Sequence, residues 1–426
     1  MLPFVAVMPM DVATQPGVGL RVEERVRRGS DISAAETEID PTLKVDFIWS
    51  GGKDRFSVLY SPRILVDSYW NQRFPAQELV NRQTINTRDP NETPFSYLNN
   101  GGIDYESVHD RWRLSLQGFG AYGQISTTAI LVQPVWDGDD PPPDPFAILP
   151  ATVGARFTLL FAQAQLSVPI KLTSRLALIP AINYNAFGGA DRESKGVIAL
   201  SRGPGVSLGL DWAATRHDRF LTQVGAGIVN NDFQDQQASV TIYRGIGTES
   251  WQHWYSEHVS HILSGGGSFG GDSVNGYELY SLGSASVLFD SWPTLRIPPG
   301  GAPAGTIGHG QRIQVGVTAK TEPWIDVFSG DLENRFTLSA AANYTVGRVT
   351  WRAYVAQAHV LNTPQSVAKY QIVIGEAGAR LRITKELSGD VGLRVGYQNF
   401  TNAVRFSELS QFTGSVGFTY APIQRF

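Results

Sequence analysis

The sequence predicts an all-β chain that closes into an antiparallel transmembrane barrel of about eighteen strands. Three observations predict it: apolar and polar residues alternate along most of the chain, many alternating segments are about 10 to 15 residues long, and short connections alternate with long ones. Strands of soluble proteins are commonest at about 5–6 residues, whereas a tilted strand that crosses a bilayer needs about 9–11. Sixteen strands is the alternative, if the first two segments form a plug or an arm.

The composition agrees with such a barrel and excludes several other classes. Charged residues make up 17 % of the chain, below the roughly 25 % of soluble proteins, and the net charge of −4 argues against a broadly basic nucleic-acid-binding protein. The absence of cysteine excludes a disulfide scaffold, a thiolate metal site and a cysteine nucleophile. No apolar run reaches 18 residues, so the sequence offers no transmembrane helix.

The expected strands share a period of two. In 333–346, Phe336 and Leu338 lie on one face, and Arg335 and Thr337 lie on the other. The strands are expected at 16–28, 40–50, 54–66, 105–118, 120–133, 154–170, 174–187, 196–213, 217–230, 237–245, 249–263, 276–290, 309–322, 333–346, 348–358, 369–384, 388–400 and 409–422. Residues 1–15 are expected to form an N-terminal segment, and residues 16–426 a single barrel domain.

The connections alternate in length, as in barrels with short turns at one end and long loops at the other. Short turns are expected at 51–53, 119, 171–173, 214–216, 347 and 385–387, and long loops at 67–104, 134–153, 188–195, 264–275, 323–332, 359–368 and 401–408. The connection 291–308 is long where a short turn is due. A closed barrel with both termini at one end needs an even number of strands, and segment 237–245 supplies the strand that this parity demands.

Aromatic residues flank several short turns on the apolar face, where they are expected to form a girdle at the level of the lipid headgroups. They are Trp49, Phe56, Trp212, Phe220, Tyr344 and Trp351. The alternation of Phe412, Phe418 and Tyr420 leads to a terminal Phe426. In this the chain resembles bacterial outer-membrane β-barrel proteins, such as porins and the porin-type barrels that accompany exopolysaccharide export. The resemblance implies an outer-membrane location, contact with outer-membrane lipid, and recognition of Phe426 by the barrel-assembly machinery.

Motifs that could indicate an enzyme or a metal site lie in unsuitable places. The G-x-S-x-G matches at 205–209 and 266–270 fall in a strand and a glycine-rich loop, not in a strand–turn–helix elbow. His253, His258 and His261 do not converge on one face of a strand, and the acidic loop 136–146 lacks an EF-hand pattern. No metal, cofactor or catalytic residue is therefore predicted.

Cations stand on the polar faces of the strands, where they must line the lumen because a charge toward lipid would cost about 2–4 kcal/mol at the midplane. They are Arg111, Arg113, Arg312, Lys320, Arg335, Arg352, Arg380, Arg382 and Arg394, against the acids Asp46, Asp211 and Glu376. This excess predicts a locally cationic pore for anionic solutes or a secreted acidic polysaccharide. In the latter case, periplasmic export components would be partners. The alternatives are a plugged structural or adhesion barrel, a barrel-embedded hydrolase and a soluble β-propeller. The permeant and the oligomeric state stay open.

Overall fold

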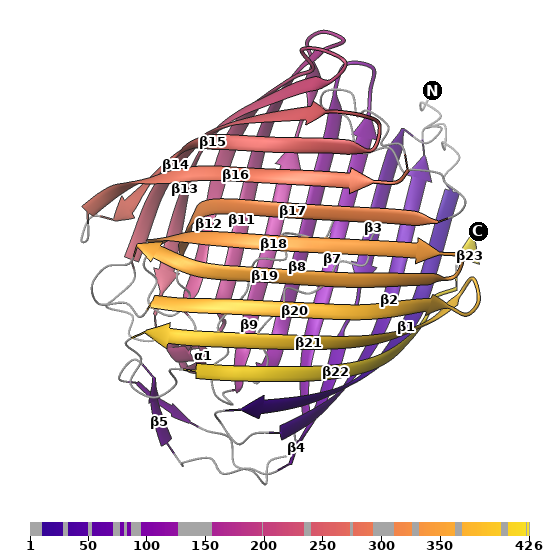
Figure 1. The fold of residues 1–426 in the computed structure, drawn as a ribbon, viewed down its shortest axis with the longest axis vertical. Coiled ribbons are helices and arrows are strands. Elements are labelled where there is room, and N and C mark those ends of the chain that lie inside the picture. Colours follow the sequence, from indigo (N-terminus) through magenta and orange to yellow (C-terminus); the bar gives the residue numbers. More distant parts are fainter. Residues whose placement is uncertain are drawn as a thin grey trace, which may run out of the picture.

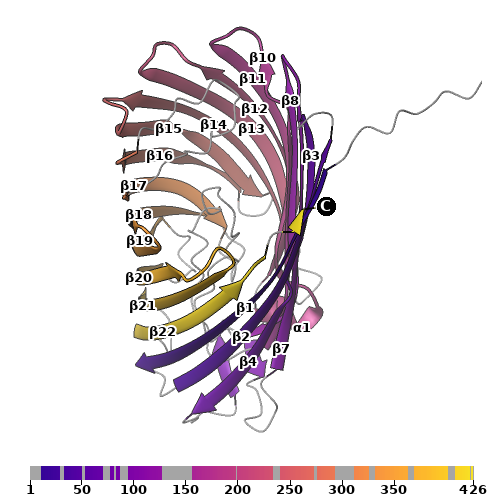
Figure 2. The same cartoon turned by 90° about the vertical axis from the view of Figure 1, so that its right-hand side faces the viewer.

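A computed structural model describes the chain over 11–28, 33–49, 53–70, 77–80, 83–86, 95–126, 156–197, 199–233, 240–272, 276–292, 311–325, 332–362, 369–401, 408–422 and 424–425. Strands dominate this part of the chain, and they form one closed antiparallel barrel of 18 strands. The ring closes where β1 (Asp11–Arg28) pairs with β2 (Ser33–Trp49) on one side and with β22 (Glu408–Tyr420) on the other. Figures 1 and 2 show the later strands facing the earlier ones across the barrel.

Neighbours in sequence are neighbours in the ring. The third barrel strand is interrupted, as β3 (Asp54–Tyr60) and β4 (Arg63–Trp70), and the sixth is extended by the short β10 (Ile170–Lys171). The others are β7 (Phe95–Val108), β8 (Arg113–Ser126), β9 (Arg156–Ser167), β11 (Leu176–Gly189), β12 (Leu200–Trp212), β13 (Asp218–Asp232), β14 (Val240–Trp254), β15 (Val259–Asp272), β16 (Gly276–Asp290), β17 (Arg312–Ile325), β18 (Leu332–Val346), β19 (Val349–Asn362), β20 (Lys369–Arg382) and β21 (Leu387–Thr401).

Short turns gather at one end of the barrel, which we call the turn end, and the opposite end is the loop end. β1 starts and β22 finishes at the turn end. β1 begins at Asp11, five residues before the predicted start. Pro422, which cannot donate to a ladder, lies just beyond β22, where β23 (Gln424–Arg425) pairs with β1. Phe426 lies outside the described residues.

Two of the predicted turns are wrong. Turns were expected at Phe119 and after 245, where Gly-x-Gly sequences occur, but Gly118–Gly120 lies inside β8 and Gly245–Gly247 lies inside β14. At Gly118 a side chain would crowd Ile103 on β7, at 3.2 Å from its Cγ1. Glycine there makes room for a neighbour, and does not turn the chain.

The turns that replace them are built from polar and aromatic side chains. Between β7 and β8, the His109 N–H donates to the Trp112 carbonyl at 2.9 Å and the two rings stack at 3.9 Å. Between β14 and β15, the Ser256 hydroxyl accepts the N–H groups of His258 and Val259. The predicted loop 264–275 is likewise mostly strand, because β15 continues to Asp272.

Two small elements lie outside the ring of strands. The helix α1 (Arg192–Val197) follows β11 and packs against β9 and β11. The strands β5 (Gln77–Val80) and β6 (Gln83–Asn86) pair only with each other. Within the described ranges, no helix has the length and apolar character needed to cross a membrane.

The barrel carries large apolar side chains on its outer face and charged side chains on its inner face, the reverse of a soluble protein. Val391, Leu393 and Val395 alternate along β21 on its outer face and are 54 %, 54 % and 53 % exposed. Arg394 stands between them on the inner face, beside Glu376. The predicted alternation is therefore correct, and its apolar side faces outward.

Candidate functional site: the inner wall of the barrel

The inner wall carries ion pairs, most of them between neighbouring strands. Five of the nine predicted lumen cations have a carboxylate partner on the wall. The pairs are Arg113–Glu106 at 2.8 Å, Arg312–Asp290 at 2.6 Å, Lys320–Glu322 at 3.0 Å, Arg335–Glu322 at 3.6 Å and Arg394–Glu376 at 3.0 Å. Each joins residues on one strand or on adjacent strands, so the barrel's own register neutralises these cations.

The other four predicted cations divide by position. Arg111 is an exposed residue of the turn 109–112, so its prediction as a strand residue of the lumen wall is wrong. Arg380 donates to the Ser388 hydroxyl at 3.2 and 3.3 Å. Arg352 and Arg382 are exposed, and Arg382 closes β20 at the turn end. Arg352 has no carboxylate within ion-pair distance among the described residues.

The sequence underestimates the acids of the inner wall. Asp46, Asp211 and Glu376 are there as predicted, paired with Arg55, Arg219 and Arg394. Glu106, Asp290 and Glu322 were not predicted, and each stands at or near the end of its strand. The signal was available, since each has the parity of the polar face of its strand.

Asp290 shows how tightly one such acid is held. Its carboxylate accepts hydrogen bonds from Arg312, from the Gln314 amide at 3.1 Å and from the Trp292 N–H at 3.0 Å. The Arg312 guanidinium also lies 4.8 Å from the centre of the Trp292 ring. Charge, hydrogen bonding and stacking thus fix this pair where β16 and β17 meet the turn end.

One wall cation was not singled out by the sequence. The register places Arg244 on the inner face of β14, between Gly227 of β13 and Gly270 of β15. It is exposed, and no carboxylate of the described residues lies within ion-pair distance. Arg244 and Arg352 are therefore positive positions on the wall that the described ion pairs do not neutralise.

The two halves of the inner wall differ in exposure. Toward the turn end, the wall side chains Gln117, Gln163 and Gln165 are exposed. Toward the loop end, wall side chains are buried although they point inward. They include Leu98, Ala121, Leu159, Ile242, Arg335, Thr337, Ala356, Ala358, Ile372 and Ile374. Toward the turn end the wall is open at these glutamines, although Ala177 and Asp211 there are buried, and toward the loop end the side chains just named are covered.

The six predicted girdle residues lie on the outer face, close to the turn end. Trp212 pairs directly with Phe220 and their rings stack at 5.7 Å, and Tyr344 pairs directly with Trp351. The third pair is arranged differently, because Phe56 pairs with Phe47, and Trp49 stacks on Tyr105 of β7 at 6.3 Å. Their role as a membrane girdle stays a prediction.

The histidines lie on the outer side of the barrel, near the turn end. His253 of β14 pairs directly with His261 of β15, and His258 lies in the turn between these strands. His253 contacts Asp218 at 2.8 Å, and the Trp251 indole donates to the same carboxylate at 3.0 Å. No group of His, Cys, Asp or Glu that could hold a metal ion occurs in the described ranges.

The G-x-S-x-G matches lie in the interiors of strands, Ser207 in β12 and Ser268 in β15. The Ser268 hydroxyl donates to the Gly245 carbonyl at 3.0 Å, across the β14–β15 ladder. Neither serine occupies a strand–turn–helix elbow. The acidic loop 136–146 lies outside the described residues.

The chain resembles known proteins in fold alone. No family model and no curated protein sequence matches it. Among solved structures, it is similar to Pseudomonas aeruginosa OpdO, with 11 % identity, a TM-score of 0.46, and 97 % of each chain covered. It is also similar to P. aeruginosa OccK1 (OpdK), with 11 % identity and a TM-score of 0.46, covering 96 % of this chain and 99 % of that one. A BenF-like porin from Pseudomonas fluorescens Pf-5 has 12 % identity and a TM-score of 0.46, with 96 % and 99 % covered.

Proposed function

We propose that this chain is an outer-membrane channel that passes small solutes through the barrel. The observation that carries the proposal is a closed ring of strands with an apolar outer face and a charged inner face. Large apolar side chains such as Leu393 and Val416 face outward, and ion-paired charged side chains such as Arg394 and Glu376 face inward. Such a wall is stable only with hydrocarbon outside and water or polar groups inside.

We further propose a weak anion preference that resides in a few wall positions. Ion pairs neutralise most of the cations predicted on the wall, so the anion preference would come from Arg244 and Arg352. An unneutralised cation on a low-dielectric wall lowers the entry barrier of an anion. The expectation of an acidic polysaccharide depended on an excess of nine cations over three acids, and the further wall acids Glu106, Asp290 and Glu322 reduce that excess. Small anions are the cargo that the remaining charges favour.

A plugged structural barrel is the second candidate, and one observation favours it. Inner-wall residues toward the loop end are buried, among them Ile372 and Arg335, which are 0 % and 1 % exposed. This filled half would constrict a channel, or it would close the barrel altogether. The open half, with Gln163 and Gln165 exposed, then forms a vestibule at the turn end.

Conductance in planar bilayers separates the two candidates. A channel gives discrete conductance steps. Under a KCl gradient we expect a reversal potential of the sign that indicates chloride preference. Its magnitude should decrease as the salt concentration rises, because salt screens the wall charges. The double variant Arg244→Gln with Arg352→Gln is expected to abolish this preference. Arg216→Gln, in the exposed turn between β12 and β13, is the matched control. A folded barrel without conductance supports the plugged structure, and potassium preference in the wild type contradicts the anion proposal.

A further inference from the structure

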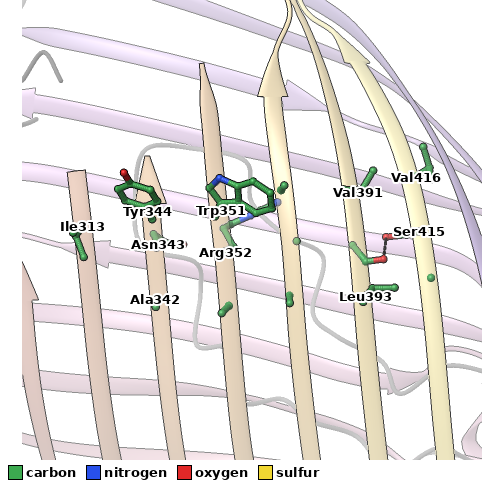
Figure 3. A pocket seen from close by; sticks show the side chains of 16 residues that line it. Ile313, Ala342, Asn343, Tyr344, Trp351, Arg352, Val391, Leu393, Ser415 and Val416 are labelled. Atoms are coloured by element: carbon green, nitrogen blue, oxygen red, sulfur yellow. Dashed lines mark hydrogen bonds between the residues drawn. The ribbon is translucent and has the colours of Figure 1, made fainter. Parts of the chain in front are cut away.

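An apolar groove crosses the outer face of β17–β22 near the turn end (Figure 3). Its volume is about 1030 Å³. The floor consists of small side chains that meet across the strands: Ala342 pairs with Ala353, and Ala353 pairs with Ala377. Ala379 and Gly414 widen it. The depression exists because these small residues adjoin one another on a face that elsewhere carries Val, Leu and Phe.

Large side chains border this floor. Tyr344 and Trp351 are direct cross-strand partners and stand side by side at the end of the groove that lies toward the turn end (Figure 3). Leu393 and Val391 rise from β21 on the far side, each 54 % exposed. The groove is therefore apolar along its length, and the amphipathic ends of Tyr and Trp lie where it approaches the turns.

Two cations lie just beyond these rings. Arg348 follows Gly347, which has a φ of +59° in the turn between β18 and β19. The Arg348 guanidinium donates a hydrogen bond to the Ile383 carbonyl at 3.2 Å. Lys385 lies in the next turn, between β20 and β21. Both are exposed, and no carboxylate of the described residues forms an ion pair with either. The nearby Glu386 instead accepts a hydrogen bond from the Tyr420 hydroxyl at 3.4 Å.

We propose that this groove binds an anionic phospholipid, with one acyl chain on the Ala342–Ala353–Ala377 floor and the phosphate at Arg348 and Lys385. This inference rests on the proposed location in a membrane. Hydrocarbon must fill an apolar depression that faces lipid, and aromatic residues mark the headgroup level. Basic side chains just beyond that level complement an anionic headgroup. A second copy of the chain fits less well, because a two-fold contact through the groove would bring the two sets of Arg348 and Lys385 toward each other.

Native mass spectrometry of the folded barrel tests the proposal. The barrel, in an uncharged detergent, is titrated with phosphatidylglycerol or with phosphatidylcholine of the same acyl chains. We expect one phosphatidylglycerol to bind about tenfold more tightly than phosphatidylcholine. Ala353→Leu with Ala377→Leu fills the floor and should weaken the binding of both lipids. Arg348→Gln with Lys385→Gln should abolish only the preference for phosphatidylglycerol.

Matched controls separate the groove from the rest of the surface. Ala319→Leu with Ala340→Leu adds the same bulk on the outer face of β17 and β18 outside the groove, and Lys53→Gln with Arg216→Gln removes two charges from other turns. Both should bind as the wild type does. The proposal would be overturned if the two lipids bound equally well or if the groove variants bound lipid as the wild type does. It would also be overturned if the wild type formed a dimer that Ala353→Leu with Ala377→Leu dissociates. Failure of the wild type to enter lipid vesicles would instead contradict the membrane location.

Discussion

Arg394 on β21 donates two hydrogen bonds to one carboxylate oxygen of Glu376 on β20, at 3.1 and 3.0 Å. The two residues are direct partners in the ladder, and both face the lumen. The Glu376 side chain is 44 % exposed, so water screens the pair and it contributes little to stability. Its importance lies in the charge that it presents to a passing ion.

Glu376→Gln is therefore expected to change selectivity and not folding. It leaves Arg394 unneutralised, and a unit charge at about 4 Å is worth about 1 kcal/mol in water, so the ratio of chloride to potassium permeability should rise about fivefold. The measurement is the reversal potential under a KCl gradient at low salt. Arg394→Gln is the converse control and should lower the ratio. If both variants shift the potential in the same direction, the pair does not face the conduction path.

The two faces of β17 can be tested with neighbouring residues. Val315→Arg places a charge on the outer face and should lower the yield of folded barrel, at a cost of up to about 4 kcal/mol near the midplane. Gln314→Arg should be tolerated, because Gln314 faces inward and contacts the Asp290 carboxylate. The readout is the heat-dependent shift in gel migration after refolding into detergent. Equal yields would mean that the faces have been assigned wrongly.

Asp211→Asn is expected to be among the most destabilising single changes on the wall. Asp211 is fully buried and accepts two hydrogen bonds from Arg219, at 2.7 and 2.5 Å. Loss of one partner from a buried pair costs about 3–5 kcal/mol, because the other charge stays uncompensated. Chemical denaturation in detergent measures this difference in the free energy of unfolding. Adding Arg219→Gln should recover part of it, and a double variant as unstable as the sum of the singles would contradict a direct interaction.

The helix α1 should open in acid. Burial tends to raise the pKa of Asp191, but hydrogen bonds from Thr158, Ser194 and Glu193 outweigh it and hold the pKa below the usual value. A lowered pKa in the folded state means that this stabilisation is complete above about pH 4 and is lost as the pH falls through the folded value. Hydrogen exchange at the Ser194 amide, which donates to the Asp191 carboxylate at 2.7 Å, reports the change.

Asp191→Asn provides the matched test. In this variant the Ser194 amide should be as poorly protected at every pH as it is in the wild type in acid. Glu193→Gln changes a neighbouring side chain and should leave the protection of the Ser194 amide as in the wild type. Acid-independent exchange in the wild type would show that the Asp191 carboxylate does not hold the helix.

The sequence by itself determined which face of each strand meets lipid, because the period of two is a local property. Any strand in which Val391, Leu393 and Val395 alternate with Arg394 must send the two sets to opposite faces. Strand length indicated a membrane barrel, because each strand must cross the bilayer, and the count of alternating segments together with an even parity indicated eighteen strands.

Only the tertiary structure decided which charges neutralise one another. The partner of Arg312 is Asp290, and that of Arg113 is Glu106, and each pair depends on the register between two strands. Register is a property of two segments together, so an error in one turn displaces every pairing along both strands. The turn predicted at Phe119 displaced the predicted pairing of β7 and β8. It also placed Arg111 on the wall, although Arg111 lies in the turn between these strands.

The groove also arises from the assembled sheet. Ala342, Ala353 and Ala377 stand on three successive strands, β18, β19 and β20, and they form a floor only because the register between these strands aligns them. A depression is a relation between neighbouring side chains on different strands, whereas alternation is a relation between successive residues on one strand. The first therefore requires the three-dimensional structure, and the second is already present in the order of the amino acids.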